Sequence, residues 1–429
     1  MGPLRVGLAG MGTVGQGVLD ILERQAALVA RRAGRPIVVT RVASRRRRDD
    51  VDIGAATFSL NPLELVAADD VDVVVELMGG TDTALDLIAS AIAAGRPVVT
   101  ANKAVMARHG NDLLATAQAG GVPVLFEASV AGAIPIIGSL RHGLAANAVT
   151  SVAGIINGTS NFILSAMTAG ADFSAALAEA QRLGYAEADP TFDVEGIDAA
   201  HKLTILAALA FEMPFAFAAV HCEGITRITP EDLRSAARLG YAIKHLGIAR
   251  QTPAGVELRV HPTLIPKEHM MAHVNGVMNA VLVRGDAAGD TLYCGPGAGS
   301  LPTASAVVAD LIELARGGVP VHTRSEPVPA VLPIAACSSA YYLRIPSLDR
   351  PGVFARLATL LGEHAISIAS VEQRGEEVHA VEGRAWVPVA IITDRVQEHV
   401  MDAALAALAA LPDVVGAIVR MRVEEFTHD

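Results

Sequence analysis

Residues 4–15 read LRVGLAGMGTVG and decide the fold of the first part of the chain. The apolar run Leu4–Ala9 predicts a short buried strand, and the glycines at 10–15 have the spacing GxGxxG. Apolar residues at helical spacing continue to about Ala30, so the glycines stand between a strand and a helix. Glycines at such a turn let backbone N–H groups approach a pyrophosphate, and a turn without a ligand is the alternative. The expected dinucleotide contacts are Gly10, Gly12, Thr13, Val14 and Gly15.

Strand and helix patterns alternate through the rest of the first third of the chain. Short apolar runs bounded by turn residues predict strands, and the stretches between them predict helices. Such alternation is typical of an α/β fold with a Rossmann-type, doubly wound parallel sheet, whose ligands bind at the carboxyl ends of the strands. The predicted strands are 37–43, 71–77, 97–100 and 122–126, and the predicted helices include 83–94 and 111–119.

The end of the second predicted strand bears on the choice of cofactor. An NAD site usually has an acidic residue about 20 residues after the glycines, at the ribose 2′-hydroxyl. This chain has four arginines at 45–48 instead, and guanidinium groups suit a 2′-phosphate. We therefore expect a preference for NADP, with NAD also usable, and Arg45 as the contact because it lies nearest the strand. A solvated basic loop is the alternative interpretation.

The composition limits the functions open to this chain. Its 429 residues are enough for about three domains, and 52% are hydrophobic. The net charge of -11 and the 4% of aromatic residues argue against a sequence-independent nucleic-acid binder. The cysteines Cys222, Cys294 and Cys337 are far apart, which disfavours a disulfide framework or a zinc site. No apolar stretch reaches roughly 20 residues and no signal peptide is visible, so we expect a cytoplasmic protein without a membrane partner.

A cluster of carboxylates in the middle of the chain is the strongest chemical signal. Five acidic residues fall between Glu187 and Asp198, in a loop broken by proline and glycine. Clustered carboxylates can hold an ammonium group or tune the pKa of a lysine. Lys202 is four residues after Asp198 and heads an apolar helix, so burial could make it a proton donor. A surface ion pair worth about 0.3–0.5 kcal/mol is the alternative that these residue types leave open.

Several motifs along the whole chain resemble those of homoserine dehydrogenases. The glycine-rich start has the form GxGxVG, residues 100–103 read TANK, and residues 158–162 read GTSNF. Residues 295–299 read GPGAG and are followed by PTAS at 302–305. The segment 184–202 is the most specific part of the resemblance, because it matches the family in residue type and spacing.

The resemblance implies the reversible, NAD(P)H-dependent reduction of L-aspartate 4-semialdehyde to L-homoserine. In the family, the lysine matching Lys202 is the general acid/base at the carbonyl oxygen, with the aspartate matching Asp198 beside it. The lysine matching Lys103 lies between cofactor and substrate, which puts the active site between two domains. The resemblance also implies substrate contacts at Glu187, Asp193 and Thr159, and cofactor contacts at Gly79, Thr100, Lys103 and Gly299.

A sodium ion is a further ligand that the resemblance implies. In the family it is bound by backbone groups of a loop similar to residues 127–134, which read EASVAGAI. The matching positions are Glu127, Val130, Gly132 and Ile134. A purely structural loop is the alternative.

The last quarter of the chain carries a βαββαβ pattern, which is typical of a ferredoxin-like unit. With DRPG at 349–352 it resembles an ACT domain, which implies an amino-acid effector such as threonine near Asp349, Gly352 and Val353. A domain that only dimerises is the alternative. The predicted strands are 340–345, 366–368, 386–393 and 417–423, and the predicted helices end near His364 and cover 396–411.

These patterns divide the chain into domains. We expect a dinucleotide-binding domain at 1–135, with a return helix at 300–318 packed against it. An α+β substrate and dimerisation domain is expected at 136–299, a proline-containing linker at 319–339 and the ACT domain at 340–429. A homodimer or homotetramer follows from the resemblance.

Two other classes of protein combine similar domains. A 3-phosphoglycerate dehydrogenase would need a His/Glu pair and an arginine, and would have no role for the segment 187–202. A ligand sensor without catalysis would be favoured by loss of Lys103 or Lys202, and both are present. A cysteine-dependent semialdehyde dehydrogenase is disfavoured because no cysteine has a nucleophile context, and we expect no aspartokinase domain.

Overall fold

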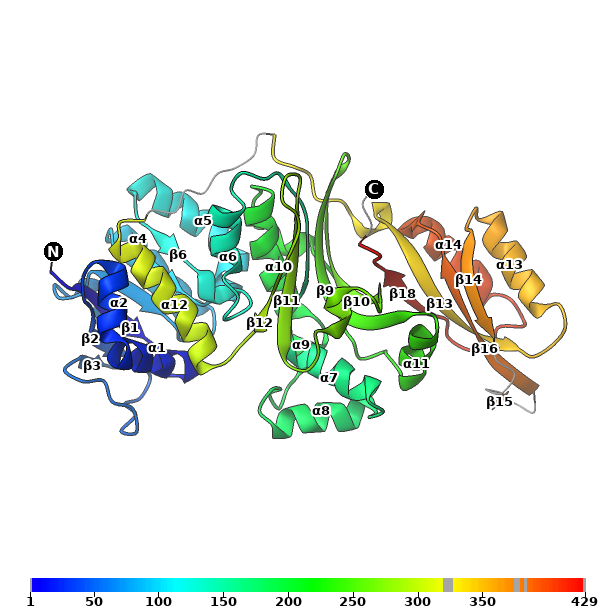
Figure 1. Ribbon diagram of the computed structural model, residues 1–429, viewed down its shortest axis with the longest axis horizontal. Helices are drawn as coiled ribbons and strands as arrows, with labels where there is room; N and C mark the ends of the chain where they lie inside the picture. The colour runs from blue at the N-terminus through cyan, green and yellow to red at the C-terminus, as the bar shows by residue number, and fades with distance from the viewer. Residues whose placement is uncertain (1, 319–326, 374–378, 382–383, 427–429) are drawn as a thin grey trace.

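The computed structural model describes residues 2–318, 327–373, 379–381 and 384–426. Three parts follow one another along its longest axis (Figure 1): a helix-covered parallel sheet, a central sheet, and a C-terminal α/β unit. Parts of the predicted linker at 319–339 and of the predicted ACT domain at 340–429 therefore lie outside the described residues. Within the described part of the chain, no helix is long and apolar enough to cross a membrane.

The first sheet has six parallel strands in the order β3-β2-β1-β4-β5-β6. This order reverses direction beside β1, as in a Rossmann fold, and it confirms the predicted doubly wound sheet. The short strand β3 was not predicted, because three residues show no periodicity. The bounds are β1 Leu4–Ala9, β2 Ile37–Ala43, β3 Thr57–Ser59, β4 Val73–Glu76, β5 Val98–Thr100 and β6 Val124–Leu125.

The helices around this sheet differ from the prediction mainly at their ends. The helix expected after the glycines is broken at Gln25, and α5 begins at Lys103 rather than Asn111. Asn102 starts α5 early because its side-chain oxygen accepts a hydrogen bond from the Val105 N–H at 3.1 Å. The bounds are α1 Thr13–Arg24, α2 Ala26–Ala33, α3 Glu64–Ala67, α4 Asp82–Ala93, α5 Lys103–Gly120 and α12 Ser300–Ala315.

The central part is built on the antiparallel strands β12-β11-β7-β9-β10. Strands were predicted at 150–156 and 277–284, and β7 and β11 confirm them. The long β9–β10 hairpin was missed because most of its residues are buried on both faces, so hydrophobicity does not alternate. The bounds are β7 Val149–Ile155, β8 His221–Cys222, β9 Tyr241–Thr252, β10 Gly255–Pro266, β11 Met278–Gly285 and β12 Gly289–Pro296.

Helices of the central part carry much of its polar chemistry. Figure 1 shows α10 beside the central sheet and α7, α8 and α9 below it. Almost every residue of α10 is buried, as the apolar sequence after Lys202 predicted. The bounds are α6 Ile136–Gly138, α7 Gly158–Thr168, α8 Phe173–Arg182, α9 Thr191–Val194, α10 Ile197–Ala210 and α11 Pro230–Arg238.

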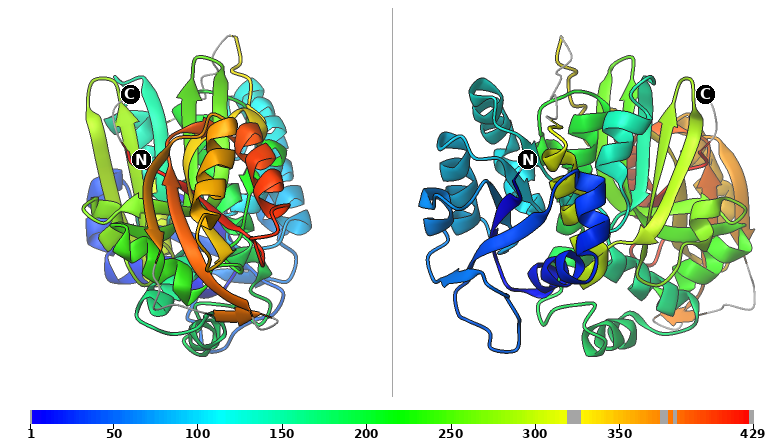
Figure 2. Two further views of the ribbon diagram at one scale, coloured as in Figure 1. Left: turned by 90° about the vertical axis from the view of Figure 1, so that its right-hand side faces the viewer. Right: turned by 60° about the vertical axis from the view of Figure 1, so that its left-hand side comes forward.

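The C-terminal unit confirms the predicted βαββαβ order. Its strands pair antiparallel in the order β18-β13-β16-β14, and both helices cover one face (Figure 2, left). Strand β13 begins at Ser338, inside the predicted linker, and two further short strands are present. The bounds are β13 Ser338–Leu348, α13 Val353–Glu363, β14 Ile368–Gln373, β15 His379–Val381, β16 Arg384–Thr393, β17 Val396–Gln397, α14 Glu398–Ala409 and β18 Val419–Val423.

The central and C-terminal sheets form one continuous sheet. Strand β18 pairs in parallel with β10, with Thr263 opposite Arg422 and Leu264 opposite Val423. Figure 1 shows the dark red β18 lying beside the green β10. The last strand of the chain therefore attaches the C-terminal unit directly to the central part, which the sequence did not predict.

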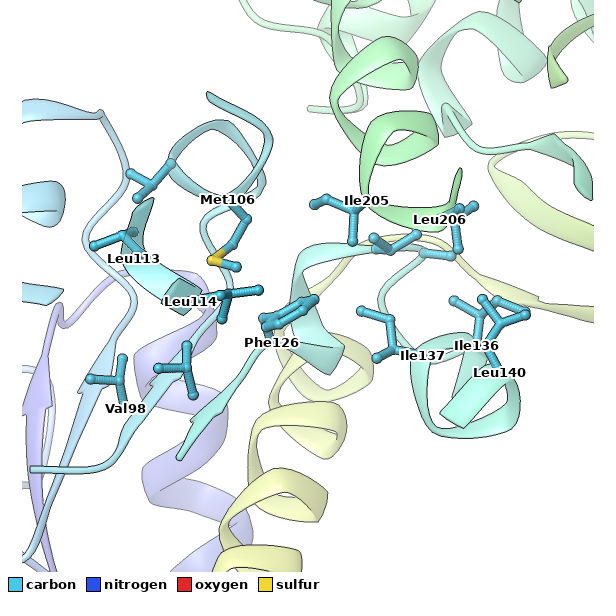
Figure 3. Packing of buried hydrophobic residues seen from close by; sticks show 14 of the residues in the cluster. Val98, Met106, Leu113, Leu114, Phe126, Ile136, Ile137, Leu140, Ile205 and Leu206 are labelled. Atoms are coloured by element: carbon cyan, nitrogen blue, oxygen red, sulfur yellow. The ribbon is translucent and has the colours of Figure 1, made fainter. Parts of the chain in front are cut away.

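One hydrophobic core runs from the first part into the central part (Figure 3). Phe126, at the end of the parallel sheet, lies between Leu114 of α5 and Ile137 of α6. Ile205 and Leu206 extend this cluster onto α10. Because these side chains are shared, α5 and α10 are held at a fixed separation, and this positions the residues at their first turns.

Candidate active site

The glycine-rich turn leaves one side of the backbone open. A Cβ on Gly10 would lie 2.5 Å from the Leu77 carbonyl oxygen, and one on Gly15 would lie 2.1 Å from the Gly10 oxygen. Nothing lies within 4 Å of the position of a Cβ on Gly12, which precedes α1. No side chain caps the N-terminus of α1, so its first N–H groups are available to an anion. The turn therefore fits a pyrophosphate, as the sequence predicts.

The neighbouring strand ends are joined by a buried carboxylate. Glu76 accepts hydrogen bonds from the Thr100 hydroxyl at 2.7 Å and from the Met78 N–H at 2.8 Å. Burial raises the pKa of Glu76, although these hydrogen bonds oppose the shift. Thr100, a predicted cofactor contact, thus uses its hydroxyl to hold the sheet edge, while Gly79 has open space beside it.

The four arginines after β2 have different surroundings. Arg48 pairs with Asp50, and Arg47 lies 5.8 Å from the centre of the Phe58 ring. Arg45 and Arg46 are exposed at the end of the strand. The structure thus leaves the guanidinium of Arg45, the predicted 2′-phosphate contact, accessible to a ligand.

The returning segment 295–299 meets this site through α12. Gly297 lies directly against Asn279, because a Cβ there would be 1.8 Å from the amide oxygen. Gly299 precedes α12, whose Ser300 hydroxyl donates to the Thr13 carbonyl oxygen at 2.7 Å. Gly299 therefore directly precedes a residue that contacts the glycine-rich turn. Gly297 instead allows close packing against Asn279 in the central part.

Two lysines and one aspartate meet between the first part and the central part. Lys103 begins α5, and Asp198 and Lys202 lie in the first turns of α10. The Asp198 carboxylate accepts from the Lys103 ammonium at 2.7 Å with one oxygen and from the Lys202 ammonium at 2.7 Å with the other. Lys202 also donates to the Ile156 carbonyl oxygen at 2.7 Å. The structure thus joins the three predicted catalytic residues in one chain of charge-assisted bonds, in which Asp198 and Lys202 are buried and Lys103 is partly exposed.

The two lysines of this chain differ in proton affinity. Burial lowers the pKa of Lys202, and the attraction of Asp198 offsets this only in part. Burial also acts to lower the pKa of Lys103, but the charge and hydrogen bond of Asp198, together with the charges of Asp193 and Glu187, outweigh it, so this pKa is raised. Burial would raise the Asp198 pKa, but the two ammonium groups hold it below its ordinary range. Lys202 is thus the group that releases a proton more readily.

The predicted substrate residues surround this chain. Asn157 donates its amide hydrogens to Asp193 at 2.7 Å and to Asp198 at 2.8 Å, and burial raises the Asp193 pKa. Glu187 is exposed on the loop after α8, and its charge acts on the pKa of Lys103. The hydroxyl of Thr159 donates to the Tyr185 carbonyl oxygen at 2.6 Å, so it holds this loop.

Asn157 is a residue that the sequence interpretation missed. It caps α7 by accepting from the Ser160 N–H at 2.7 Å while its amide group bridges the two aspartates. An asparagine directly before a helix was the available signal, because such a residue is a strong N-cap. The bridge itself joins residues 36 and 41 positions apart in sequence, and local pattern does not show it.

An aromatic stack beside Lys103 was also missed. The Lys103 ammonium lies 5.6 Å from the centre of the Phe192 ring, which is 5.5 Å from the His201 ring. The His201 ring stacks on the Phe217 ring with their centres 4.3 Å apart, and the Arg108 guanidinium lies over the Phe217 ring. This stack connects α5 with α10 next to the lysine–aspartate chain.

The loop 127–134 presents backbone oxygen atoms beside the first sheet. The carbonyl oxygens of Glu127 and Ile134 accept N–H groups at 3.3 and 2.8 Å, which leaves a lone pair on each. Gly132 lies against the Gly297 carbonyl. The carbonyl groups of this loop fit a hard cation such as sodium in ligand type. Among the described residues, no cluster of three or more acidic, histidine or cysteine side chains has metal-binding geometry.

The turn predicted to bind an effector lies far along the chain, before α13. The Asp349 N–H donates to the Ala385 carbonyl oxygen at 3.0 Å, and the Val353 N–H donates to that of Arg350 at 3.3 Å. Gly352 has φ of +83° and precedes the first helical residue. The turn is thus built around the N-terminus of α13, which no described side chain caps, although the Val353 N–H is already used within the turn.

Comparisons with known proteins show the family of this chain. The family model described as "Homoserine dehydrogenase" matches residues 135–312, and that of its NAD binding domain matches residues 10–127. The ACT domain model matches residues 341–413. A curated homoserine dehydrogenase from Pseudomonas aeruginosa is 52% identical over 437 residues, covering 99% of this chain and 100% of the relative. The chain belongs to the homoserine dehydrogenase family.

Solved structures of homoserine dehydrogenases share the fold. The enzyme from Thiobacillus denitrificans is 49% identical, has a TM-score of 0.93, and is matched over 99% of this chain and 98% of its own. A hyperthermophilic archaeal homoserine dehydrogenase in complex with NADPH is 25% identical, with a TM-score of 0.62 over 72% of this chain and 97% of its own. As a homoserine dehydrogenase, the protein is an oxidoreductase with an NAD-binding domain and an ACT domain.

Proposed function

We propose that the protein interconverts L-aspartate 4-semialdehyde and L-homoserine with NADP, and that Lys202 is its general acid/base. The observation that carries this proposal is the position of Asp198 between Lys103 and Lys202, both at 2.7 Å. A hydride transfer to an aldehyde leaves negative charge on the oxygen, which two ammonium groups can stabilise and one can protonate.

In the direction of reduction, Lys202 donates a proton to the developing alkoxide. Its lowered pKa makes the donation easier, and Asp198 keeps its ammonium group in place. In the direction of oxidation, the neutral amine of Lys202 accepts the hydroxyl proton. NADP(H), when bound, supplies or accepts the hydride. Lys103 keeps its charge because its pKa is raised, so its role is to orient the substrate and stabilise the oxygen.

Carboxylates next to the lysine–aspartate chain would bind the amino-acid end of the substrate. Asp193 is held by Asn157 and is close enough to Asp198 for their charges to interact. Glu187 is exposed, and its charge contributes to the raised pKa of Lys103. We infer that both contact the α-ammonium group, with Thr159 holding the loop that leads to Glu187 through its bond to Tyr185.

The cofactor preference rests on the exposed arginines. Arg45 is accessible at the end of β2, where the 2′-phosphate of NADP is expected, and no acidic residue of β2 competes for a ribose hydroxyl. The archaeal relative in complex with NADPH supports use of the same cofactor. The contacts proposed around the dinucleotide are Gly10, Gly12, Thr13, Val14, Gly15, Gly79, Thr100 and Gly299.

Sodium and an amino-acid effector complete the proposal. Sodium would be held by backbone oxygens of Glu127, Val130, Gly132 and Ile134. Threonine would bind at the turn 349–353, with its carboxylate at the N-terminus of α13. The match to the ACT family supports an amino-acid effector, and such domains suit an even-numbered homo-oligomer.

The proposed domain bounds remain those expected from the sequence. The dinucleotide-binding domain is 1–135 with the return helix 300–318, the substrate domain is 136–299, and the ACT domain is 340–429 after a linker.

The experiment that tests the proposal is a spectrophotometric assay at 340 nm with L-homoserine and NADP at alkaline pH, with and without L-threonine. Absorbance that rises with NADP more than with NAD, and that threonine suppresses, would support the reaction, the cofactor and the effector together. A rise that threonine does not change would remove the proposed effector. Folded protein that gives no rise with either cofactor would overturn the proposed reaction.

A further inference from the structure

The segment 221–226 lies against the turn that begins α10. The Cys222 thiol donates to the Glu195 carbonyl oxygen at 3.2 Å, and the Ile225 N–H donates to the Val194 carbonyl oxygen at 2.8 Å. The Thr226 hydroxyl donates to the Glu195 carboxylate at 3.0 Å. Three hydrogen bonds therefore connect this segment to the turn 193–196.

The two segments approach so closely that glycine is required on both sides. A Cβ on Gly196 would lie 2.9 Å from the Cys222 sulfur, and one on Gly224 would lie 2.5 Å from the Val194 carbonyl oxygen. Gly196 directly precedes α10, and Asp198 follows two residues later. Because no space separates the segment 221–226 from the turn 193–196, a displacement of the segment would also displace Asp193 and Asp198.

The opposite side of the same segment is bonded to the last strand of the chain. The Glu223 carboxylate accepts from the Arg422 guanidinium at 2.9 Å and contacts the His221 ring at 2.8 Å. Arg422 lies on β18 of the ACT domain and also donates to both oxygens of Glu398, at 2.9 and 2.5 Å. The Glu223 main chain is fixed by bonds to Val260 and His245.

The charge of Glu223 is maintained by these neighbours. Burial acts to raise the Glu223 pKa, but the bonds to His221 and Arg422 outweigh it and lower the pKa to about 2. Glu223 is thus ionised at neutral pH, and a hydrogen bond between charged groups is stronger than one between neutral groups. Its carboxylate joins the ACT domain to the segment 221–226 by a direct ionic contact.

We propose that Glu223 is a positioning residue that couples the ACT domain to the active site. Through Glu223 and the segment 221–226, the placement of β18 sets the placement of the turn that carries Asp193 and Asp198. The roles of those aspartates in this inference rest on the proposed function, whereas the mechanical connection does not. A change in the ACT domain that moves β18 would thereby change substrate binding without contacting the substrate.

The test compares Glu223→Gln with Asp402→Asn in the full-length protein. Asp402 also accepts from an ACT-domain arginine, Arg420, at 2.5 Å, but Asp402 is exposed on α14 and reaches the segment 221–226 only through Arg420, which lies 3.9 Å from Glu223. Amide hydrogen exchange is measured across residues 191–198. Glu223→Gln should speed exchange there by about tenfold, since a hydrogen bond to a charged group is worth about 1.5 kcal/mol or more.

Steady-state kinetics provide the readout that a purely structural role would not move. Glu223→Gln should raise the KM for homoserine by about threefold to tenfold, because the loss of the same bond loosens the proposed substrate carboxylates. The KM for NADP should stay unchanged, because the glycine-rich turn has no contact with this segment. Asp402→Asn should change neither value.

Two results would overturn the inference. Faster exchange confined to 221–226, with 191–198 unchanged, would make Glu223 a local structural residue only. An equal rise in both KM values would indicate general destabilisation. If Glu223→Gln does not fold, Thr226→Val removes the Thr226–Glu195 bond from an exposed position and should raise exchange at 191–198 by a smaller factor. Hydrogen exchange needs no turnover, so a failure of the proposed reaction would be seen separately.

Discussion

Two largely buried charge clusters in this protein differ in the ratio of basic to acidic groups. At the start of α10, one carboxylate, Asp198, lies between two ammonium groups. At the junction of β10 and β18, Arg422 lies between two carboxylates, Glu223 and Glu398, and Arg420 also approaches both of them, at 3.9 and 2.8 Å. Burial acts to lower the pKa of both Arg422 and Lys202, but the carboxylates raise that of Arg422 whereas that of Lys202 stays lowered. The first cluster can release a proton and the second holds its charge.

The difference explains why one cluster is suited to catalysis and the other to structure. An ammonium group has three donors, and the described contacts of Lys202 use two of them, on Asp198 and Ile156. The third is free for a substrate oxygen. The Arg422 guanidinium is bound at three nitrogen atoms by two carboxylates, which fixes its plane as well as its charge.

The largest effect is expected from Asp198→Asn, which removes the shared anion of the α10 cluster. We expect kcat to fall by about 10² to 10⁴, the range that loss of an organised acid/base gives. Since the charge of Asp198 raises the pKa of both lysines, its loss should lower the pKa of each. The residual reductase activity should be lost as the pH rises, and this loss should occur at a lower pH than in the wild type. A pH profile of kcat/KM with an unchanged alkaline limb would contradict this reading.

The second prediction concerns the junction cluster. Glu398→Gln leaves Arg422 with one carboxylate and removes an acceptor for the Tyr341 hydroxyl, which is 2.7 Å away. Breaking a buried pair typically costs about 3 kcal/mol, so the denaturation midpoint should fall clearly. The kcat of the folded enzyme should change far less than in Asp198→Asn. An unchanged denaturation midpoint together with lost activity would contradict the structural role of the junction cluster.

Exposed charges should act on specificity rather than on stability. Arg45→Asp is expected to lower the ratio of kcat/KM for NADP to that for NAD by about tenfold, since a bond to a phosphate contributes about 1.5 kcal/mol or more. Arg48→Gln is the matched control, because Arg48 is already paired with Asp50. An equal fall in both variants would show that the loop acts only through its net charge.

The smallest effect is expected at the aromatic stack between the two helices. Burial, with a contribution from Arg108, lowers the pKa of His201 to about 4, so its ring is neutral at physiological pH. His201→Leu should lower kcat/KM by about threefold through weaker stacking on Phe217, without changing the pH profile between 5 and 8. Loss of an inflection in that range would instead assign His201 a proton-transfer role.

The sequence predicts the parts of this protein whose signals are local. The GxGxxG turn, the alternation around it and the βαββαβ order all appear as short-range patterns, and the structure contains the predicted doubly wound parallel sheet. The spacing of Asp198 and Lys202 placed them on one helical face. Lys103 reached this site in the prediction only through the resemblance, because its partner Asp198 lies 95 residues away.

Long-range contacts account for what the sequence did not predict. The β9–β10 hairpin contains buried charges such as Lys244, Glu257 and Arg259, which interrupt the apolar pattern of a core strand. Arg259 pairs with Glu257 at 3.2 Å inside the hairpin and with Glu424, far along the chain, at 3.6 Å. The pairing of β10 with β18 and the contacts of Glu223 likewise depend on residues far apart in sequence, where no local pattern exists.

The most direct test of the account is a single-turnover measurement on Lys202→Ala. NADPH and L-aspartate 4-semialdehyde are mixed at saturating concentrations, and the decay at 340 nm gives the rate of hydride transfer. We expect this rate to fall by at least about 100-fold, as loss of a general acid does, while NADPH binds with unchanged affinity. A hydride-transfer rate close to that of the wild type would show that Lys202 is not the proton donor.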